Sequence, residues 1–167
     1  MNHNEWPLVF FTLLSQLGCG MLLSALIAYG TNRAGIDWSS VKPDLLLSVT
    51  IVTGIALLIS FFHLAKPLHA VYALGNLGSS WLSREILTIS LFFAFVAISW
   101  FSIKYLPSKT VYHQVFIIMG MISGLALMYA MIRLYMIPTV PVWNRFSTPL
   151  GFLSSCLVLG PAAFRML

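Results

Sequence analysis

The chain contains five apolar stretches, and each is about long enough to cross a lipid bilayer as a helix. A helix rises about 1.5 Å per residue, so the hydrocarbon core requires about 20 apolar residues. Only 8% of the 167 residues are charged, and the mean hydropathy is +0.93. This composition excludes a water-soluble enzyme and a disordered chain. It predicts an all-α polytopic transmembrane helix bundle, a single integral membrane domain over residues 1–167, with spans near 8–29, 45–64, 86–105, 111–135 and 150–167.

The charged residues and cysteines restrict the partners that this protein can bind. Nine basic and four acidic residues give a formal charge of +5, spread without a basic run, which suits interfacial anchoring and not nucleic-acid binding. Cys19 and Cys156 lie in separate apolar stretches without metal-ligand spacing, so we expect buried thiols and no iron–sulfur cluster or metal site. The first span has no basic n-region and should remain as an uncleaved insertion signal. Glu5 is the only charge before it, which favours an external N-terminus.

Two predicted spans carry polar stripes at helical spacing. Residues three or four positions apart share one face of a helix, and polar faces turn inward because lipid offers no hydrogen-bond partners. We therefore expect both stripes to face other helices. In the second span the stripe consists of Thr53, Ala56, Ser60 and His63, and in the first span it consists of Thr12, Ser15, Gln16 and Cys19.

Ionisable residues gather where several spans reach the same membrane face. Such groups are costly at membrane depth, and they commonly mark a site or a pathway. These groups suit proton exchange with a lipid-soluble quinol, which loses two protons as it gives up two electrons. His63 could accept a hydrogen bond from a ring hydroxyl and Glu85 could take protons onward, with Lys66, Arg84 and Ser60 beside them. The collected groups are His63, Lys66, His69, Arg84, Glu85 and Arg133, with Tyr135 at the same face.

Structural roles for the same residues stay open at this point. His63 could be a polar helix end, and Arg84–Glu85 could be a charge pair at a helix start. Haem b requires two inward histidines at matched depth on different spans, and only His63 lies near a span interior at its end, so no haem is expected. The Gly120–Gly124 pair has the G-x-x-x-G spacing that brings helices into close contact.

Several motifs, in order along the whole chain, resemble the membrane anchor subunit of dimethyl sulfoxide reductase. They are His3-Asn4-Glu5-Trp6-Pro7-Leu8, Phe62-His63-Leu64 to Pro67-Leu68, Gly78-Ser79-Ser80-x-Leu82-Ser83-Arg84-Glu85-Ile86, Met131-Ile132-Arg133-Leu134-Tyr135, Pro138-Thr139-Val140-Pro141-x-Trp143, and Thr148-Pro149-Leu150-Gly151-Phe152. The resemblance implies a bacterial inner-membrane anchor with a periplasmic N-terminus. It also implies two partners, a molybdopterin catalytic subunit and an iron–sulfur electron-transfer subunit.

In such a complex the anchor binds and oxidises menaquinol and passes electrons to the iron–sulfur subunit, in anaerobic respiration. The resemblance ties His63 and Glu85 to quinol binding, and it leaves haem, iron–sulfur clusters and molybdenum out of this chain. For docking of the iron–sulfur subunit we expect a polar face formed by His69, Asn76, Arg133 and Tyr135.

The length departs from the family pattern, because family members normally have eight spans and this chain has about five. The chain is therefore a fragment, a truncated product or a short relative. Two other function classes also stay open: a small membrane transporter, and an assembly anchor without a quinol site. Replacing His63 with Arg separates the quinol-binding role from the assembly role, and solute uptake by the chain alone would indicate a transporter.

Overall fold

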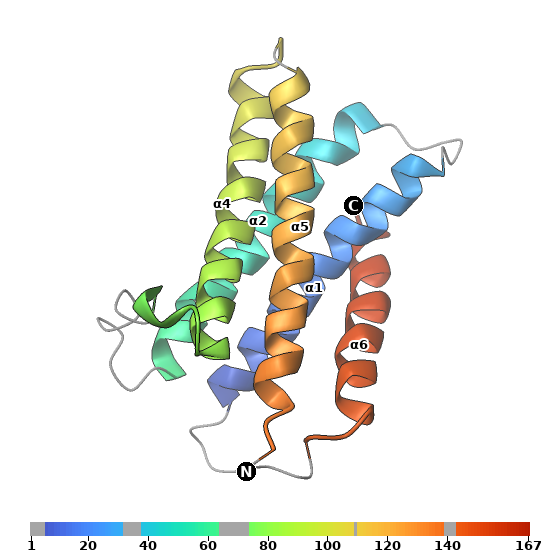
Figure 1. The fold of residues 1–167 in the computed structure, drawn as a ribbon. Coiled ribbons are helices and arrows are strands. Elements are labelled where there is room, and N and C mark those ends of the chain that lie inside the picture. The colour runs from blue at the N-terminus through green and yellow to red at the C-terminus, as the bar shows by residue number, and fades with distance from the viewer. Residues whose placement is uncertain (1–5, 32–37, 64–73, 109, 139–142) are drawn as a thin grey trace.

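The computed structural model describes residues 6–31, 38–63, 74–108, 110–138 and 143–167. At residues 38–40, 61–63, 74 and 110 only the backbone is described. Every regular element in these residues is a helix (Figure 1). The helices are α1 (Trp6–Gly30), α2 (Trp38–His63), the short 3-10 helix η2 (Leu74–Asn76), α4 (Trp81–Tyr105), α5 (Thr110–Tyr135) and α6 (Ser147–Phe164).

The long helices alternate in direction and pack as a bundle around α1. α1 packs against α2 on one side and against α6 on another, and it also contacts α5. α4 and α5 form an antiparallel hairpin that reaches the rest of the bundle through α2 and α1 (Figure 1). The starts of α1, α4 and α6 and the last turns of α2 and α5 lie at one end of the bundle, called here the N-terminal end. The α4–α5 turn, the end of α1 and the start of α2 form the opposite end.

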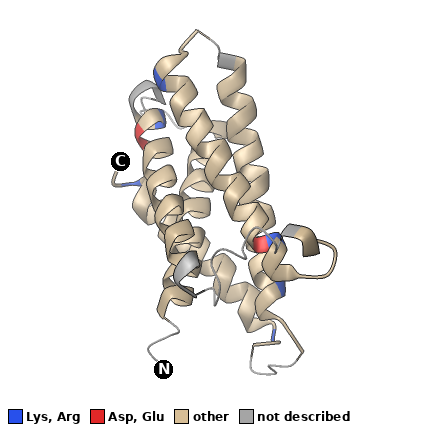
Figure 2. Ribbon diagram, turned by 90° about the vertical axis from the view of Figure 1, so that its left-hand side faces the viewer, with Lys and Arg blue, Asp and Glu red and all other residues tan. Residues whose placement is uncertain are grey.

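All five long helices are apolar and long enough to cross a membrane, which confirms the predicted all-α polytopic bundle. α2 and α4 begin earlier than the hydropathy pattern indicates, at Trp38 and Trp81 instead of residues 45 and 86. At α4 the Ser80 side chain caps the helix by accepting a hydrogen bond of 3.3 Å from the Ser83 backbone N–H. Polar residues can thus remain helical beyond the apolar core. Charged residues lie toward the ends of the helices (Figure 2).

Two glycines on α5 bring this helix close to its neighbours. A Cβ atom added to Gly120 would lie 3.1 Å from the Val96 side chain, and one added to Gly124 would lie 3.2 Å from Phe92 and from the Cys19 Sγ atom. The G-x-x-x-G pair therefore faces α4 and α1, as its spacing predicts. Phe92 and Val96 are fully buried at this contact.

A second glycine pair joins α1 to α6. A Cβ atom added to Gly20 would overlap the Cys156 carbonyl and lie 2.9 Å from the Gly160 Cα atom, and one added to Gly160 would overlap the Gly20 backbone. The thiols of Cys19 and Cys156 face each other beside this contact. Both cysteines are free and buried, as predicted.

Candidate functional site

Glu85 is the most unusual residue of the N-terminal end. It lies in the second turn of α4, about 6 Å along the axis from the start of the helix. Its side chain is 2% exposed, and its Oε1 atom has no hydrogen-bond partner among the described residues. A buried carboxylate oxygen without a partner is costly, and native structures keep few of them. A proton, a ligand or a water molecule is therefore expected at this oxygen.

Tyr135 and Thr12 bring hydroxyl groups from two other helices to the same region. The Tyr135 hydroxyl interacts with the Thr12 hydroxyl and lies within electrostatic range of the Glu85 carboxyl. Packing fixes the Tyr135 ring, whose centroid lies 5.5 Å from that of Trp143 and 5.2 Å from that of Phe152. α1, α4 and α5 thus each contribute one oxygen-bearing side chain to this region, with Thr12 and Glu85 buried and Tyr135 half-buried.

The polar stripe on α1 continues from Thr12 toward the middle of that helix. Ser15 and Gln16 follow Thr12 by about one turn, and they are 0% and 4% exposed. The Ser15 Oγ and Gln16 Oε1 atoms also lack hydrogen-bond partners in the described part of the chain. Together with the Glu85 Oε1 atom they are the buried side-chain atoms without partners there. We name Thr12, Ser15, Gln16, Glu85 and Tyr135 the polar cluster.

The stripe on α2 is buried as predicted, at least as far as its side chains are described. Thr53 and Ala56 are completely buried, and Ser60 is 8% exposed. Ser60 donates a hydrogen bond of 2.7 Å to the Leu57 carbonyl. His63 is the last residue of α2, at the N-terminal end, and its side chain lies outside the described residues. Lys66 and His69 lie outside them entirely.

Arg84 holds the turn that leads into α4. Its Nε and Nη2 atoms each donate a hydrogen bond of 2.8 Å, to the carbonyls of Leu77 and Gly78 respectively, and its guanidinium lies 4.1 Å from the centroid of the Trp81 ring. The structure records no ion pair between Arg84 and Glu85, both of which it describes in full. Arg84 therefore shapes the segment before Glu85 and does not neutralise its charge directly.

The residues expected to dock a partner separate into two groups. Asn76 and Arg133 are exposed at the N-terminal end, and Arg133 lies 5.2 Å from the Trp81 ring centroid, beside the Arg84–Trp81 contact. Tyr135 instead is half-buried, and its ring packs against Trp143 and Phe152. Its packing against α6 could not be recognised from its place at the end of an apolar span. The α1 hydroxyl and amide groups were visible in the sequence as a stripe, but nothing there linked them to Glu85.

At the opposite end of the bundle, polar contacts join the start of α5 to α4 and to the turn between them. His113 is buried, and its Nε2 atom lies 3.1 Å from the Leu106 carbonyl at the α4–α5 turn. Ser99 donates a hydrogen bond of 3.5 Å to the His113 carbonyl. The described residues hold no group of three or more His, Cys, Asp or Glu that could bind a metal ion.

The fold and the polar cluster define a multispanning α-helical membrane protein with a buried carboxylate near one membrane boundary. The family described as DMSO reductase anchor subunit (DmsC) matches residues 1–167. The protein therefore belongs to the DMSO reductase anchor subunit family.

Three relatives are similar to the protein over most of its length. The protein is 30% identical over 161 residues to a chain of the anaerobic dimethyl sulfoxide reductase of Escherichia coli, covering 95% of this protein and 55% of that relative. It is 29% identical over 148 residues to a chain of the anaerobic dimethyl sulfoxide reductase of Haemophilus influenzae, and the match covers 89% of this protein and 53% of that relative. It is 30% identical over 180 residues to a subunit of the sulfite dehydrogenase of Allochromatium vinosum, and the match covers 99% of this protein and 54% of that relative. The protein thus spans about half the length of these relatives, and no solved structure matches it significantly.

Proposed function

We propose that this protein is the membrane anchor of a dimethyl sulfoxide reductase-type complex and that it oxidises menaquinol at the polar cluster. Electrons pass from this site to an iron–sulfur subunit, and a separate molybdopterin subunit reduces the terminal acceptor. The complex lies in the bacterial inner membrane, with the N-terminal end of the bundle on the periplasmic side. The single observation that carries the proposal is the buried Glu85 carboxyl, whose Oε1 atom is left without a partner among the described residues.

The chemistry of the polar cluster fits a quinol. Quinol oxidation releases two protons and two electrons, so the site requires hydrogen-bond acceptors that can also take protons. The Glu85 carboxylate can accept a hydrogen bond from a ring hydroxyl and then take its proton. Ser15 and Gln16 offer two further oxygens without partners in the described part of the chain, which can fix the orientation of the ring. The hydroxyls of Tyr135 and Thr12, from α5 and α1, interact with each other in the same region.

His63 supplies a second acceptor in this proposal. It ends α2 one turn beyond the buried Ser60, at the same end of the bundle as Glu85. A neutral imidazole can take a proton near physiological pH. Two acceptors of different type would allow the two protons of the quinol to leave along separate routes. Lys66 is proposed to stabilise the anions that form during oxidation.

The exposed surface beside the site is proposed to dock the iron–sulfur subunit. Arg133 and Asn76 are exposed there, and Arg84 and Trp81 hold this region in place. A guanidinium on an aromatic ring keeps its remaining N–H groups available for a partner carboxylate. Tyr135, which we expected in this surface, is instead proposed to act in the quinol site.

The position of the charges supports an anchor over a transporter. In the described helices the charged residues lie within the first two turns or the last turn, as with Lys42, Asp44, Lys104 and Arg133. A transporter of the inverted-repeat type would hold its substrate near the middle of the membrane, with polar groups and broken helices there. The buried acid Glu85 instead lies in the second turn of α4, and the unpartnered oxygens near the middle of α1, on Ser15 and Gln16, are uncharged.

Paired activity measurements on membranes that contain the assembled complex test the proposal. Glu85→Gln should lower reduction driven by a menaquinol analogue at least about 100-fold, because a general base contributes roughly this much. Reduction driven by a reduced viologen, which donates directly to the soluble subunits, should not change. Asp44→Asn is the control, because Asp44 is an exposed acid near the start of α2. His63→Arg should behave like Glu85→Gln.

The alternative functions make different predictions. If quinol-driven reduction survives in Glu85→Gln and His63→Arg while the complex assembles, the protein is an assembly anchor without a quinol site. If the protein alone moves a solute into vesicles, the transporter function holds.

A further inference from the structure

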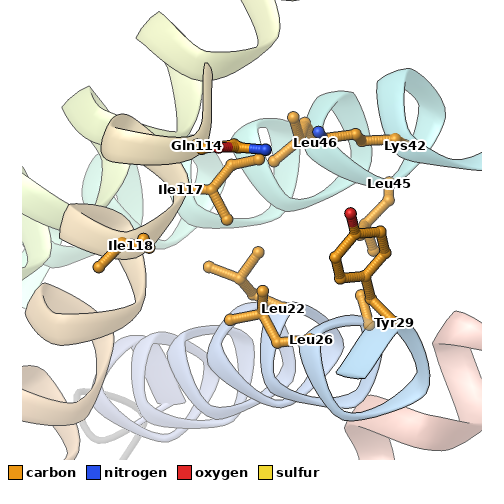
Figure 3. A pocket seen from close by; sticks show the side chains of 10 residues that line it. Leu22, Leu26, Tyr29, Lys42, Leu45, Leu46, Gln114, Ile117 and Ile118 are labelled. Carbon is orange, nitrogen blue, oxygen red and sulfur yellow. The ribbon is translucent and has the colours of Figure 1, made fainter. Parts of the chain in front are cut away.

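A cavity opens at the end of the bundle opposite the polar cluster, between α1, α2 and α5. Its volume is about 220 Å³, which exceeds the roughly 150 Å³ that accommodates a benzene molecule. Its walls are mainly aliphatic, with Leu22, Leu26, Leu45, Leu46, Ile117 and Ile118 among them (Figure 3). A space of this size and composition holds a segment of one hydrocarbon chain.

Polar groups gather at one side of this cavity. Lys42 from α2 and Gln114 from α5 extend toward each other, and the Tyr29 hydroxyl of α1 points toward the same side (Figure 3). Lys42 forms no ion pair within the described part of the chain, although it is partly buried. It lies near the start of α2, where the helix dipole adds positive potential. This side of the cavity therefore favours an anion.

The position of these groups in the membrane identifies the class of ligand. Lys42 is the second residue of the candidate span Val41–Ser60, which places it near the boundary between hydrocarbon and headgroups. The aliphatic walls continue from there into the bundle, toward Leu22 and Ile118. A quinol head would require a proton acceptor, and the described residues that line the cavity include no carboxylate and no imidazole. A cation above an aliphatic slot instead matches a phosphate that carries acyl chains.

We propose that this cavity binds an anionic phospholipid, with its phosphate against Lys42 and part of one acyl chain between α1, α2 and α5. Gln114 and Tyr29 contribute hydrogen-bonding groups beside the phosphate. The bound lipid fills a gap between three helices that meet at this end, so it also stabilises their packing. This site is independent of the quinol site proposed above, because it lies at the other end of the bundle.

Native mass spectrometry on the full protein, purified with any subunits that remain bound, tests the proposal. The protein is titrated with phosphatidylglycerol and, separately, with phosphatidylcholine of the same acyl chains. We expect one phosphatidylglycerol to bind with clear preference, and Lys42→Gln to weaken its binding about fivefold. Lys104→Gln is the matched control, because Lys104 lies near the same end and contacts Trp100 and Tyr105 instead of the cavity.

A second pair of variants tests the acyl-chain slot without changing charge. Ile118→Trp should fill the mouth of the cavity and weaken binding, whereas Ile122→Trp should not. Ile118 and Ile122 lie one turn apart on α5 and are 55% and 56% exposed, but only Ile118 lines the cavity. This pair keeps the proposal testable even if one lysine variant folds poorly.

Results of several kinds would overturn the proposal. These are equal binding of the two lipids, an equal effect of Lys104→Gln, no effect of Ile118→Trp, and displacement of the lipid by a short-chain menaquinone analogue, which would assign the cavity to the quinone. Inorganic phosphate at millimolar concentration should not displace the lipid, because it lacks the acyl chain. Displacement by phosphate alone would instead indicate a simple anion site.

Discussion

The contact between α1 and α6 depends on two glycines, and enlarging one of them should weaken the bundle measurably. In Gly20→Ala the new methyl group overlaps the Cys156 carbonyl and crowds the Gly160 Cα atom. The obstructing atoms belong to the backbone of a helix, so a rotamer change cannot relieve the overlap and α6 must move away. Overpacking of this kind costs about 1–3 kcal/mol.

The expected shift in thermal stability follows from this cost. For a domain of this size each kcal/mol changes the unfolding midpoint by about 2–4 °C, so Gly20→Ala and Gly160→Ala should each lower it by roughly 2–12 °C. Gly151→Ala is the control, because an added Cβ atom on this exposed α6 residue meets nothing within 4 Å. Replacing a helical glycine with alanine there should keep or raise stability, by up to about 1 kcal/mol.

The assay uses the two buried cysteines of the protein. Cys19 and Cys156 are shielded in the folded bundle, so a maleimide dye that fluoresces on reaction with thiols reports their exposure during heating. The signal should rise at lower temperature in Gly20→Ala than in the wild type and in Gly151→Ala. Equal midpoints for all three proteins would refute the close packing of α6 on α1.

Two further substitutions test local contacts at opposite ends of the bundle. Arg84→Gln removes the hydrogen bonds to the Leu77 and Gly78 carbonyls, so limited proteolysis should cut this turn faster while the helices stay folded; an unchanged cleavage rate would show that other contacts hold the turn. His113→Phe removes the contact with the Leu106 carbonyl and should cost about 1–2 kcal/mol, measured by thermal unfolding, with quinol-driven reduction unchanged. A loss of quinol-driven reduction in His113→Phe would indicate that the redox site lies at the end of the bundle opposite Glu85, which would contradict the proposed quinol site.

The spans and the inward stripes could be predicted from the sequence because both are local patterns. A run of about 20 apolar residues has few alternatives to a membrane helix, and spacing by three or four residues fixes a face. Thr53 and Ala56 on α2, and Ser15 and Gln16 on α1, are buried as this spacing predicts. Helix starts were less predictable, because polar residues before an apolar run can be helical when a cap such as Ser80 is present.

Contacts between distant segments could not be predicted in this way. Tyr135 ends an apolar span and looks like an interfacial residue, but its ring packs against Phe152 of α6 and its hydroxyl interacts with Thr12 of α1. The proximity of Cys19 to Cys156 likewise depends on the glycine contact between their helices. The cavity beside Lys42 requires residues from three helices, and no single stretch of sequence carries its signal.

The most direct test of the central claim is photolabelling of the membrane complex with an azido-menaquinone, followed by identification of the modified peptides. Binding at the polar cluster predicts labels in the first half of α1 around Ser15 and Gln16, at the start of α4 around Glu85, and at the end of α5 around Tyr135. An excess of unlabelled menaquinone should suppress these labels. Labels that instead fall on the cavity beside Lys42 and Gln114, with none around Glu85, would contradict a quinol site at the polar cluster.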